Sequence, residues 1–320
     1  MMTDYDQLLD AETKAFIERT NSFYPPDTID YTIAQQREIY DRMCREFHAG
    51  HPAGLTAETT AIEAPGRAIP IRIYRAAKPD LTATVLYFHG GGFMLGGLES
   101  HDDVCAEICD RTGYEVVSVD YRLSPEHLYP ACHEDGYAAF EWAATAYADR
   151  AIVLAGDSAG GNIAAAVAGR YRAHPHAPAG QVLIYPGLGG DHTAGSYIEH
   201  ANAPMLTTRD MAFYQNIRTG GADVSRDASF GPLRDTDFSG LPPTVCVMAE
   251  CDPLASDGPA YRDAIRAAGG KAVSFEEKGL VHGYLRARTT VGRARDSFTR
   301  IVDAVKALGA GEWVEQSPAR

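Results

Sequence analysis

The chain has 320 residues, of which 45% are hydrophobic and 22% are charged. This composition is typical of a globular protein with a substantial buried core, and it excludes disorder over most of the length. The formal net charge of −14 repels phosphate backbones and anionic lipid, so we expect neither nucleic acid nor a membrane surface as a partner.

The sequence contains no recognisable targeting segment. Met1–Asp6 is acidic and no apolar stretch follows it, so we expect no secretory signal. No run approaches the roughly 18 apolar residues of a membrane span. We therefore expect a cytoplasmic protein whose six cysteines are buried free thiols. Cys105 and Cys109 share a helical face, but no second ligand pair accompanies them, so we expect no metal.

The first fifty residues show helical patterns before any strand. Tyr5–Arg19 and Ile33–Phe47 are both predicted to be helices. A β-hairpin is then predicted from Thr59–Ala64 and Ile69–Arg75, because Pro65-Gly66 between these two runs is a typical turn sequence.

Strand and helix patterns alternate through the rest of the chain. Near-continuous apolar runs of this length are typical of a sheet that is covered on both faces, and strand–helix alternation predicts mostly parallel pairing. We predict an α/β fold: a three-layer α/β sandwich with about eight mostly parallel strands. The further predicted strands are 84–88, 115–119, 151–155, 181–185, 244–248 and 272–275, and the predicted helices are 102–111, 134–147, 159–172, 259–268 and 293–308.

One long segment interrupts this alternation. Residues 187–237 lie between two core strands and contain one helical piece near Thr208–Ile217. A gap of this length in a compact domain usually forms a lid or a binding element. We interpret it, together with the N-terminal helices, as a helical cap over the carboxyl edge of the sheet. An N-terminal arm and a separate surface loop are the alternative. The predicted parts are 1–50 (cap), 51–186 (core), 187–237 (cap insertion) and 238–320 (core).

The segment Gly156–Asn162, Gly-Asp-Ser-Ala-Gly-Gly-Asn, follows a predicted strand and opens a predicted helix. Such a sharp strand-to-helix turn strains its corner residue and needs small neighbours, so that the Ser158 side chain is exposed above a helix N-terminus. We therefore predict Ser158 to be a nucleophile. The alternatives are a structural turn with a serine cap, and a phosphate loop, which lacks the required Gly-Lys-Ser/Thr.

A glycine-rich loop, His89-Gly90-Gly91-Gly92, follows the strand that ends at Phe88. Consecutive glycines leave backbone N–H groups free to stabilise the negative oxygen of a tetrahedral intermediate. We predict Gly90, Gly91 and Ala159 as the oxyanion donors. His89 is predicted to brace the loop, and a mobile hairpin loop is the alternative.

A nucleophilic serine needs a base and a carboxylate that orients the base. His282 follows the last core strand, and Asp252 follows the strand before it. The order Ser158, Asp252, His282 is the one that α/β-hydrolases require. Glu250 and Asp257 are rival carboxylates.

These motifs together resemble the bacterial hormone-sensitive-lipase family of α/β-hydrolase esterases. The resemblance extends from about residue 83 to the C-terminus. It implies hydrolysis of short-acyl carboxylic esters by the triad above, without a cofactor, beneath an N-terminal helical cap. The segments that carry it are His89–Phe93, Asp120–His127, Gly156–Asn162, Asp252–Leu254 and His282–Tyr284.

The predicted function is thus a serine carboxylesterase acting on small-molecule esters. An amide or formamide hydrolase with the same triad, and a ligand receptor without catalysis, are the alternatives. Phe93, Phe213 and Tyr214 are candidate substrate contacts, although the last two can equally belong to the core of the cap. The strand near Ala272–Phe275 is a candidate sheet edge, so we expect a homodimer.

Overall fold

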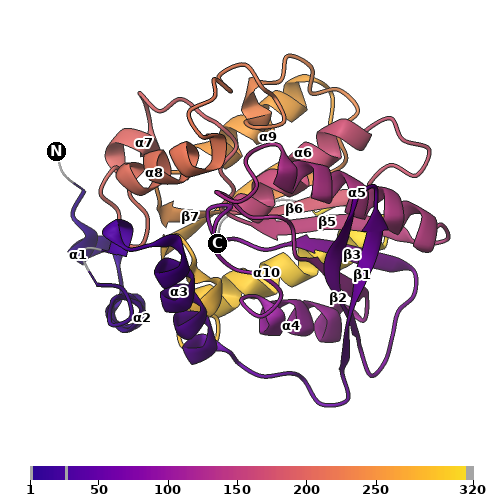
Figure 1. Ribbon diagram of the computed structural model, residues 1–320, viewed down its shortest axis with the longest axis horizontal. Helices are drawn as coiled ribbons and strands as arrows, with labels where there is room; N and C mark the ends of the chain where they lie inside the picture. Colours follow the sequence, from indigo (N-terminus) through magenta and orange to yellow (C-terminus); the bar gives the residue numbers. More distant parts are fainter. Residues whose placement is uncertain (1–2, 26–27, 315–320) are drawn as a thin grey trace.

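A computed structural model describes residues 3–25 and 28–314, and its centre is a twisted sheet of eight strands (Figure 1). The predicted α/β sandwich is confirmed. The strands are β1 (Thr56–Ala64), β2 (Arg67–Arg75), β3 (Ala83–Phe88), β4 (Glu115–Val119), β5 (Ala151–Asp157), β6 (Gly180–Ile184), β7 (Thr244–Cys251) and β8 (Ala272–Val281).

The strands are arranged in the order β1-β2-β4-β3-β5-β6-β7-β8. β2 runs antiparallel to both of its neighbours, β1 and β4, whereas all pairs from β4 to β8 are parallel. The predicted hairpin closes at Pro65-Gly66, where Gly66 has a φ of 75°. Because the central strands are parallel, their carboxyl ends meet at one edge, where ligands bind in open α/β sheets.

Helices cover both faces of this sheet, and alternate residues of each strand contact opposite layers. On β5, Val153 and Ala155 belong to one apolar cluster, and Ile152 and Leu154 belong to the other. This alternation follows from the two-residue period of a strand. α4 (Asp102–Thr112) and α10 (Gly292–Gly309) cover the first face; α5 (Ala131–Ala146), α6 (Ala159–Tyr171) and α9 (Asp257–Ala267) cover the second.

Two segments distant in the sequence form the cap, which lies on the left in Figure 1, at the carboxyl ends of the strands. An apolar cluster joins them: Tyr40 and Met43 from the first segment pack with Phe213 and Tyr214 from the second. The helices of these two segments are α1 (Tyr5–Leu8), α2 (Ala11–Asn21), η1 (Thr28–Asp30), α3 (Ile33–Phe47), α7 (Ser196–Glu199) and α8 (Thr208–Thr219). The 3₁₀ helix η2 (Pro232–Arg234) lies near the end of the segment 187–237, and η3 (Tyr284–Ala287) lies in the core segment that follows.

The first predicted helix, Tyr5–Arg19, is wrong as a single element. The structure divides it into α1 and α2 at Leu9-Asp10. The Asp10 side chain accepts the Thr13 N–H at 2.8 Å and thereby starts a new helix. An aspartate favours such an N-cap because its carboxylate satisfies an otherwise free backbone donor. Residues 1–2, 26–27 and 315–320, which the predicted parts include, lie outside the described residues.

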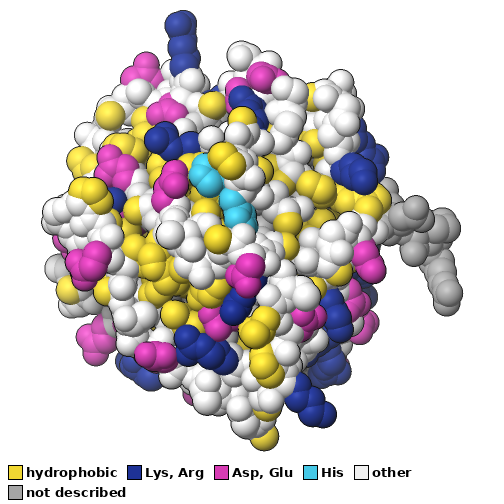
Figure 2. All heavy atoms as spheres, turned by 90° about the vertical axis from the view of Figure 1, so that its right-hand side faces the viewer, with side chains coloured by type: hydrophobic (Ala, Val, Ile, Leu, Met, Phe, Trp, Pro, Cys, Tyr) yellow, Lys and Arg dark blue, Asp and Glu magenta, His cyan; other side chains and the backbone are white. Residues whose placement is uncertain are grey.

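The surface opposite the cap mixes charges of both signs. Figure 2 shows Lys and Arg side chains interspersed with Asp and Glu across this face, with apolar atoms in scattered groups. Among residues 3–25 and 28–314, no helix is long and apolar enough to cross a membrane. The six cysteines are free and buried, as predicted. β8 lies at an edge of the sheet, so pairing of two copies through this strand stays a prediction.

Candidate active site

The turn from β5 into α6 places Ser158 at the carboxyl edge of the sheet. Ser158 has φ 53° and ψ −116°, a strained conformation for a residue with a side chain. The helix begins so close to β3 that a Cβ atom on Gly160 would lie 1.9 Å from the Phe88 carbonyl oxygen. Glycine is therefore required beside the serine, and the tight turn leaves the Ser158 side chain directed into a pocket.

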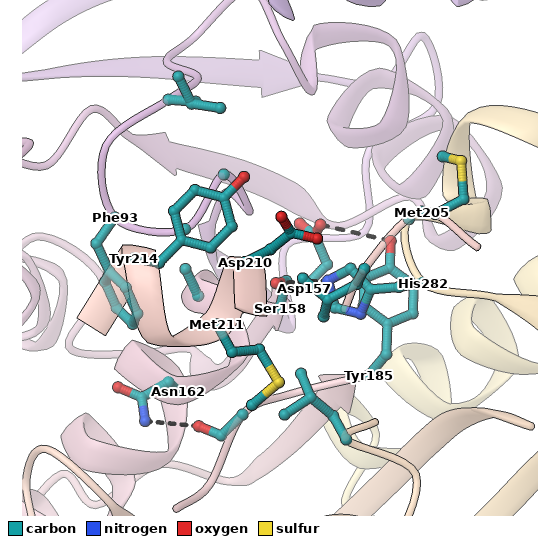
Figure 3. A pocket seen from close by; sticks show the side chains of 18 of the residues that line it. Phe93, Asp157, Ser158, Asn162, Tyr185, Met205, Asp210, Met211, Tyr214 and His282 are labelled. Atoms are coloured by element: carbon teal, nitrogen blue, oxygen red, sulfur yellow. Dashed lines mark hydrogen bonds between the residues drawn. The ribbon is translucent and has the colours of Figure 1, made fainter. Parts of the chain in front are cut away.

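Three side chains from distant positions meet at this turn. His282 Nε2 lies 2.8 Å from Ser158 Oγ, and His282 Nδ1 lies 2.7 Å from Asp252 Oδ2. Asp252 is fully buried and also accepts the Leu254 N–H at 2.9 Å, which fixes the orientation of its carboxylate. Ser158 and His282 lie side by side in Figure 3. The arrangement has the geometry of a nucleophile, a base and an orienting acid.

The two rival carboxylates make other contacts. Glu250 accepts hydrogen bonds from Lys278 Nζ at 2.9 Å and from the Gly279 N–H at 2.7 Å. Asp257 accepts the Leu188 N–H at 2.6 Å and the hydroxyl of Tyr197. Among the residues that the structure describes, neither carboxylate forms a hydrogen bond to His282, so the geometry favours Asp252.

The glycine loop differs from the expectation in one donor. The Gly90 N–H donates to Asp157 Oδ1 at 2.9 Å and is therefore already engaged. Gly91 and Gly92, with φ of 131° and 61°, line the pocket together with Ala159. The sequence did not show that the Gly90 N–H is engaged, because this depends on where the buried Asp157 carboxylate lies.

Asp157 is the centre of a buried hydrogen-bond network that holds the loop. Its carboxylate accepts the Tyr87 hydroxyl at 2.8 Å, contacts His101 Nε2 at 3.2 Å, and accepts the Tyr185 hydroxyl at 3.4 Å. Burial by itself raises the pKa of Asp157, but His101 and the hydrogen bonds outweigh it and hold the pKa well below its ordinary value. Asp157 is therefore ionised, and its carboxylate holds the glycine loop in place beside the nucleophile.

His89 braces the loop and does not reach Ser158, in agreement with its predicted role. Its Nδ1 lies 2.8 Å from the Gly90 carbonyl oxygen, and its ring stacks on Tyr121 with centroids 4.3 Å apart. Burial and the neighbouring His101 lower the pKa of His89 to about 4, so the ring is neutral near pH 7.

A cavity of about 390 Å³ surrounds Ser158 and His282. Of the three predicted substrate contacts, Phe93 and Tyr214 line it, whereas Phe213 is not among its lining residues and packs against Tyr214 in the cap. Sequence reasoning missed several other residues of the wall, because neither helical spacing nor a loop sequence reveals which side chains of the cap point inward. These are Met205, Met211, Arg218 and Phe230.

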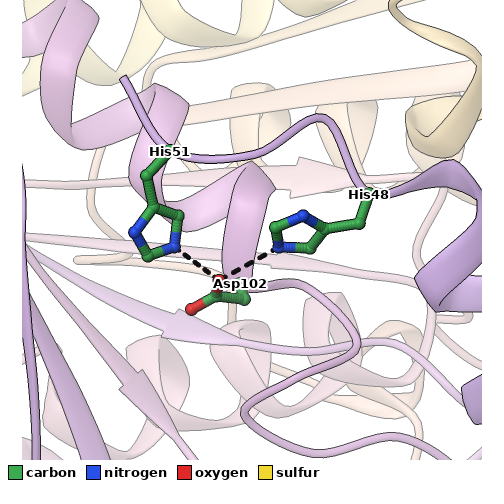
Figure 4. A group of neighbouring side chains, drawn as sticks. All are labelled: His48, His51 and Asp102. Carbon is green, nitrogen blue, oxygen red and sulfur yellow. Dashed lines mark hydrogen bonds and ion pairs between the residues drawn. The ribbon is translucent and has the colours of Figure 1, made fainter. Parts of the chain in front are cut away.

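One group outside the pocket combines metal-ligand residue types (Figure 4). His48 Nε2 and His51 Nε2 lie 3.1 and 2.5 Å from Asp102 Oδ2. However, His48 Nδ1 accepts the Gly50 N–H at 3.0 Å, which places the ring proton on Nε2 when the imidazole is neutral. A metal requires a deprotonated nitrogen at that position. We therefore interpret the cluster as hydrogen bonds that attach the segment after α3 to α4.

The comparisons with known proteins agree with this site. The family model described as "alpha/beta hydrolase fold" matches residues 85–286. Esterase LipI of Mycobacterium tuberculosis is 38% identical over 268 residues, which cover 81% of this chain and 83% of the relative. An ethyl acetate hydrolase of Pseudomonas putida is 31% identical, covering 75% of this chain and 79% of that protein.

Solved structures show the same likeness. A hyperthermophilic esterase from Pyrobaculum calidifontis superposes with a TM-score of 0.87 and is 30% identical, over 94% of this chain and 98% of that one. Fold and site thus define a hydrolase of the α/β class. More narrowly, the chain belongs to the bacterial hormone-sensitive-lipase family, as its motifs predicted.

Replacing Gly160 by alanine tests the tight turn. We expect Gly160→Ala to lower the free energy of unfolding by roughly 1–3 kcal/mol or more, because the added Cβ overlaps the Phe88 carbonyl. Gly169→Ala on the same helix is the matched control: nothing lies within 4 Å of its Cβ, so a gain of up to about 1 kcal/mol is expected. Urea titration measures both, and equal stability of the two variants would contradict the close-contact argument.

The Asp102 cluster predicts a pH-dependent contribution to stability. Burial raises the pKa of Asp102, but hydrogen bonds from Arg72, Tyr74 and the two imidazoles outweigh it and lower the pKa to about 2. The carboxylate therefore stabilises the folded state above its ordinary pKa, and this contribution is lost as the pH falls towards 2. We expect Asp102→Asn to destabilise the protein by roughly 2 kcal/mol at pH 7.

The difference between wild type and Asp102→Asn should shrink steadily below pH 4, measured by thermal or urea unfolding. Asp110→Asn is the control, because this aspartate is exposed on the same helix. A destabilisation by Asp102→Asn that is the same at pH 7 and pH 3 would show that the charge of Asp102 contributes nothing.

Proposed function

We propose that the protein hydrolyses carboxylic esters of short acyl chains through an acyl-enzyme on Ser158. The protein is an ester hydrolase by its family and by the relatives reported above. The observation that carries the mechanism is the pair of short contacts from His282, to Ser158 Oγ and to Asp252. The cavity of about 390 Å³ supports a small substrate.

In this mechanism His282 Nε2 accepts the hydroxyl proton of Ser158 as Oγ attacks the ester carbonyl carbon. Asp252 keeps the proton on Nδ1 and stabilises the imidazolium that forms. His282 then gives the proton to the leaving alcohol. Water repeats the same steps on the acyl-enzyme and releases the acid.

The negative oxygen of the tetrahedral intermediate needs preorganised donors. We assign this role to the N–H groups of Gly91, Gly92 and Ala159, because all three residues line the pocket. The Gly90 N–H is excluded, since it donates to Asp157. The hydrogen bond from the Gly90 N–H instead holds the glycine loop against the buried Asp157 carboxylate.

The alternatives are less well supported. An amide or formamide hydrolase would use the same triad, but the relatives reported above are named as ester hydrolases. A ligand receptor without catalysis would not need His282 between Ser158 and Asp252. A panel of matched esters and amides separates the first alternative from ester hydrolysis.

Removal of the nucleophile tests the mechanism directly. We expect Ser158→Ala to lower kcat for 4-nitrophenyl acetate by on the order of 10⁴-fold or more, because no other group there can form the acyl-enzyme. A fluorophosphonate probe should label the wild type and leave the variant unlabelled. Hydrolysis by the variant at the wild-type rate would contradict the assignment.

The orienting carboxylate is tested by comparing two neighbouring acids. We expect Asp252→Asn to reduce kcat by on the order of 10³–10⁴-fold, because an amide no longer favours the required histidine tautomer. Glu250→Gln is the matched control and should keep kcat within about threefold, since Glu250 pairs with the exposed Lys278. An equal loss in both variants would mean that the acid is wrongly assigned.

A further inference from the structure

A buried cation forms part of the wall of the catalytic pocket. Arg218 lies on α8, is only 4% exposed to solvent and lines the same cavity as Ser158. Its guanidinium forms no ion pair with a carboxylate of residues 3–25 or 28–314. Buried charges in proteins are usually paired, because removing an ion from water is costly. An unpaired guanidinium in a binding cavity therefore calls for an explanation.

Aromatic rings cover both faces of this guanidinium. Its central carbon lies 3.5 Å from the centroid of Phe93 and 4.0 Å from that of Phe230, and Tyr129 is 5.2 Å away. These rings stabilise the positive charge and hold the group in one plane. Because the faces are covered, only the edge of the guanidinium that carries the N–H groups is left to bind a ligand.

The N–H donors of Arg218 outnumber the acceptors around them. Nη2 donates to Asn162 Oδ1 at 3.2 Å and the guanidinium also hydrogen-bonds the Cys132 side chain, whereas the buried Nε has no partner among the described atoms. His133 lies beside it, and burial and the guanidinium itself keep the pKa of His133 well below its ordinary value, so the neighbouring ring is neutral and adds no second positive charge. Burial lowers the pKa of Arg218 to about 10, which leaves it charged at neutral pH.

The position of Arg218 relative to the triad decides which part of a substrate it meets. In Figure 3, Phe93 and Asn162 lie on the side of Ser158 away from His282. His282 must reach the oxygen of the leaving alcohol in the proposed mechanism, so the alcohol lies on its side of Ser158. The acyl chain then extends towards Phe93, Asn162 and the Arg218 edge.

The distance to be spanned is short. Asn162 follows Ser158 by four residues on α6, which corresponds to a rise of about 6 Å along the helix. The Arg218 Nη2 atom is within hydrogen-bond distance of the Asn162 side chain. An acyl group of about four or five carbons reaches from an ester carbonyl beside Ser158 to this region.

We propose that Arg218 is a carboxylate-binding residue for the acyl half of the substrate, so that the preferred esters are monoesters of short dicarboxylic acids. The ester carbonyl is attacked by Ser158, while the free carboxylate at the other end of the chain accepts hydrogen bonds from the guanidinium edge. This proposal rests on the proposed ester hydrolysis. A carboxylate supplies the missing counter-charge and matches the fork geometry of arginine.

The experiment compares two esters with the same leaving group and the same five-carbon acyl length. 4-Nitrophenyl hydrogen glutarate carries the terminal carboxylate and 4-nitrophenyl valerate does not. We expect the wild type to have the higher kcat/KM for the glutarate. In Arg218→Met the ratio of glutarate to valerate should fall at least tenfold, mainly through KM for the glutarate. Arg209→Met, an exposed arginine of the same helix, is the matched control and should keep the wild-type ratio.

A smaller fall in the ratio overturns the proposal, as does a wild type that prefers the valerate. If Arg218 only attached α8 to the core, both esters would lose rate equally and the ratio would not move. Should Arg218→Met fail to fold, the wild-type preference alone decides between the two outcomes.

Binding to Ser158→Ala separates this proposal from the catalytic one, because the variant binds esters without turning them over. Calorimetric titration with monomethyl glutarate and methyl valerate then measures the acyl side by itself. Tighter binding of the glutarate supports the carboxylate site even if the proposed ester hydrolysis fails. Equal or weaker binding overturns the carboxylate site and leaves the hydrolysis unaffected.

Discussion

The close approach of α6 to the end of β3 is the constraint on which the rest of the site depends. A single methyl group at Gly160 would overlap the Phe88 carbonyl oxygen, so the helix and the strand touch through their backbones. This contact forces Ser158 into its strained conformation and places the glycine loop that follows β3 beside it. One packing contact thus holds the nucleophile beside the glycine loop. The buried strands around the turn maintain the strained backbone conformation of Ser158.

Buried polar groups then fix the orientation of what this contact has brought together. Asp157 holds the Gly90 amide, and Asp252 holds the His282 ring. Both carboxylates are buried and both accept more than one hydrogen bond. Satisfied polar networks of this kind are rigid, because breaking any bond leaves a buried group without a partner. Rigid donors are useful in catalysis because they need not reorganise when charge develops.

The cap contributes the other half of the pocket through a different kind of contact. Its two segments meet in an apolar cluster around Tyr40 and Met43, and the segment after α3 is tied to α4 by the Asp102 hydrogen bonds. Apolar packing is tolerant of residue identity, so the cap wall can vary while the triad stays constant. Arg218 is a polar residue in this wall, and its unpaired charge gives the pocket a chemical preference that the triad alone does not supply.

Local rules were sufficient to derive most of the fold and the triad from the sequence. The strand pattern, the Gly-Asp-Ser-Ala-Gly turn and the chain order of Ser158, Asp252 and His282 depend on backbone conformation and on periodicity, which neighbouring residues determine. The break at Asp10 was missed because one capping carboxylate overrode a continuous helical pattern. Only the tertiary structure decided that Asp252 contacts His282, that Gly90 is engaged, and that Arg218 faces the cavity while Phe213 does not. These outcomes depend on distances between segments far apart in the chain, and no local pattern encodes such distances.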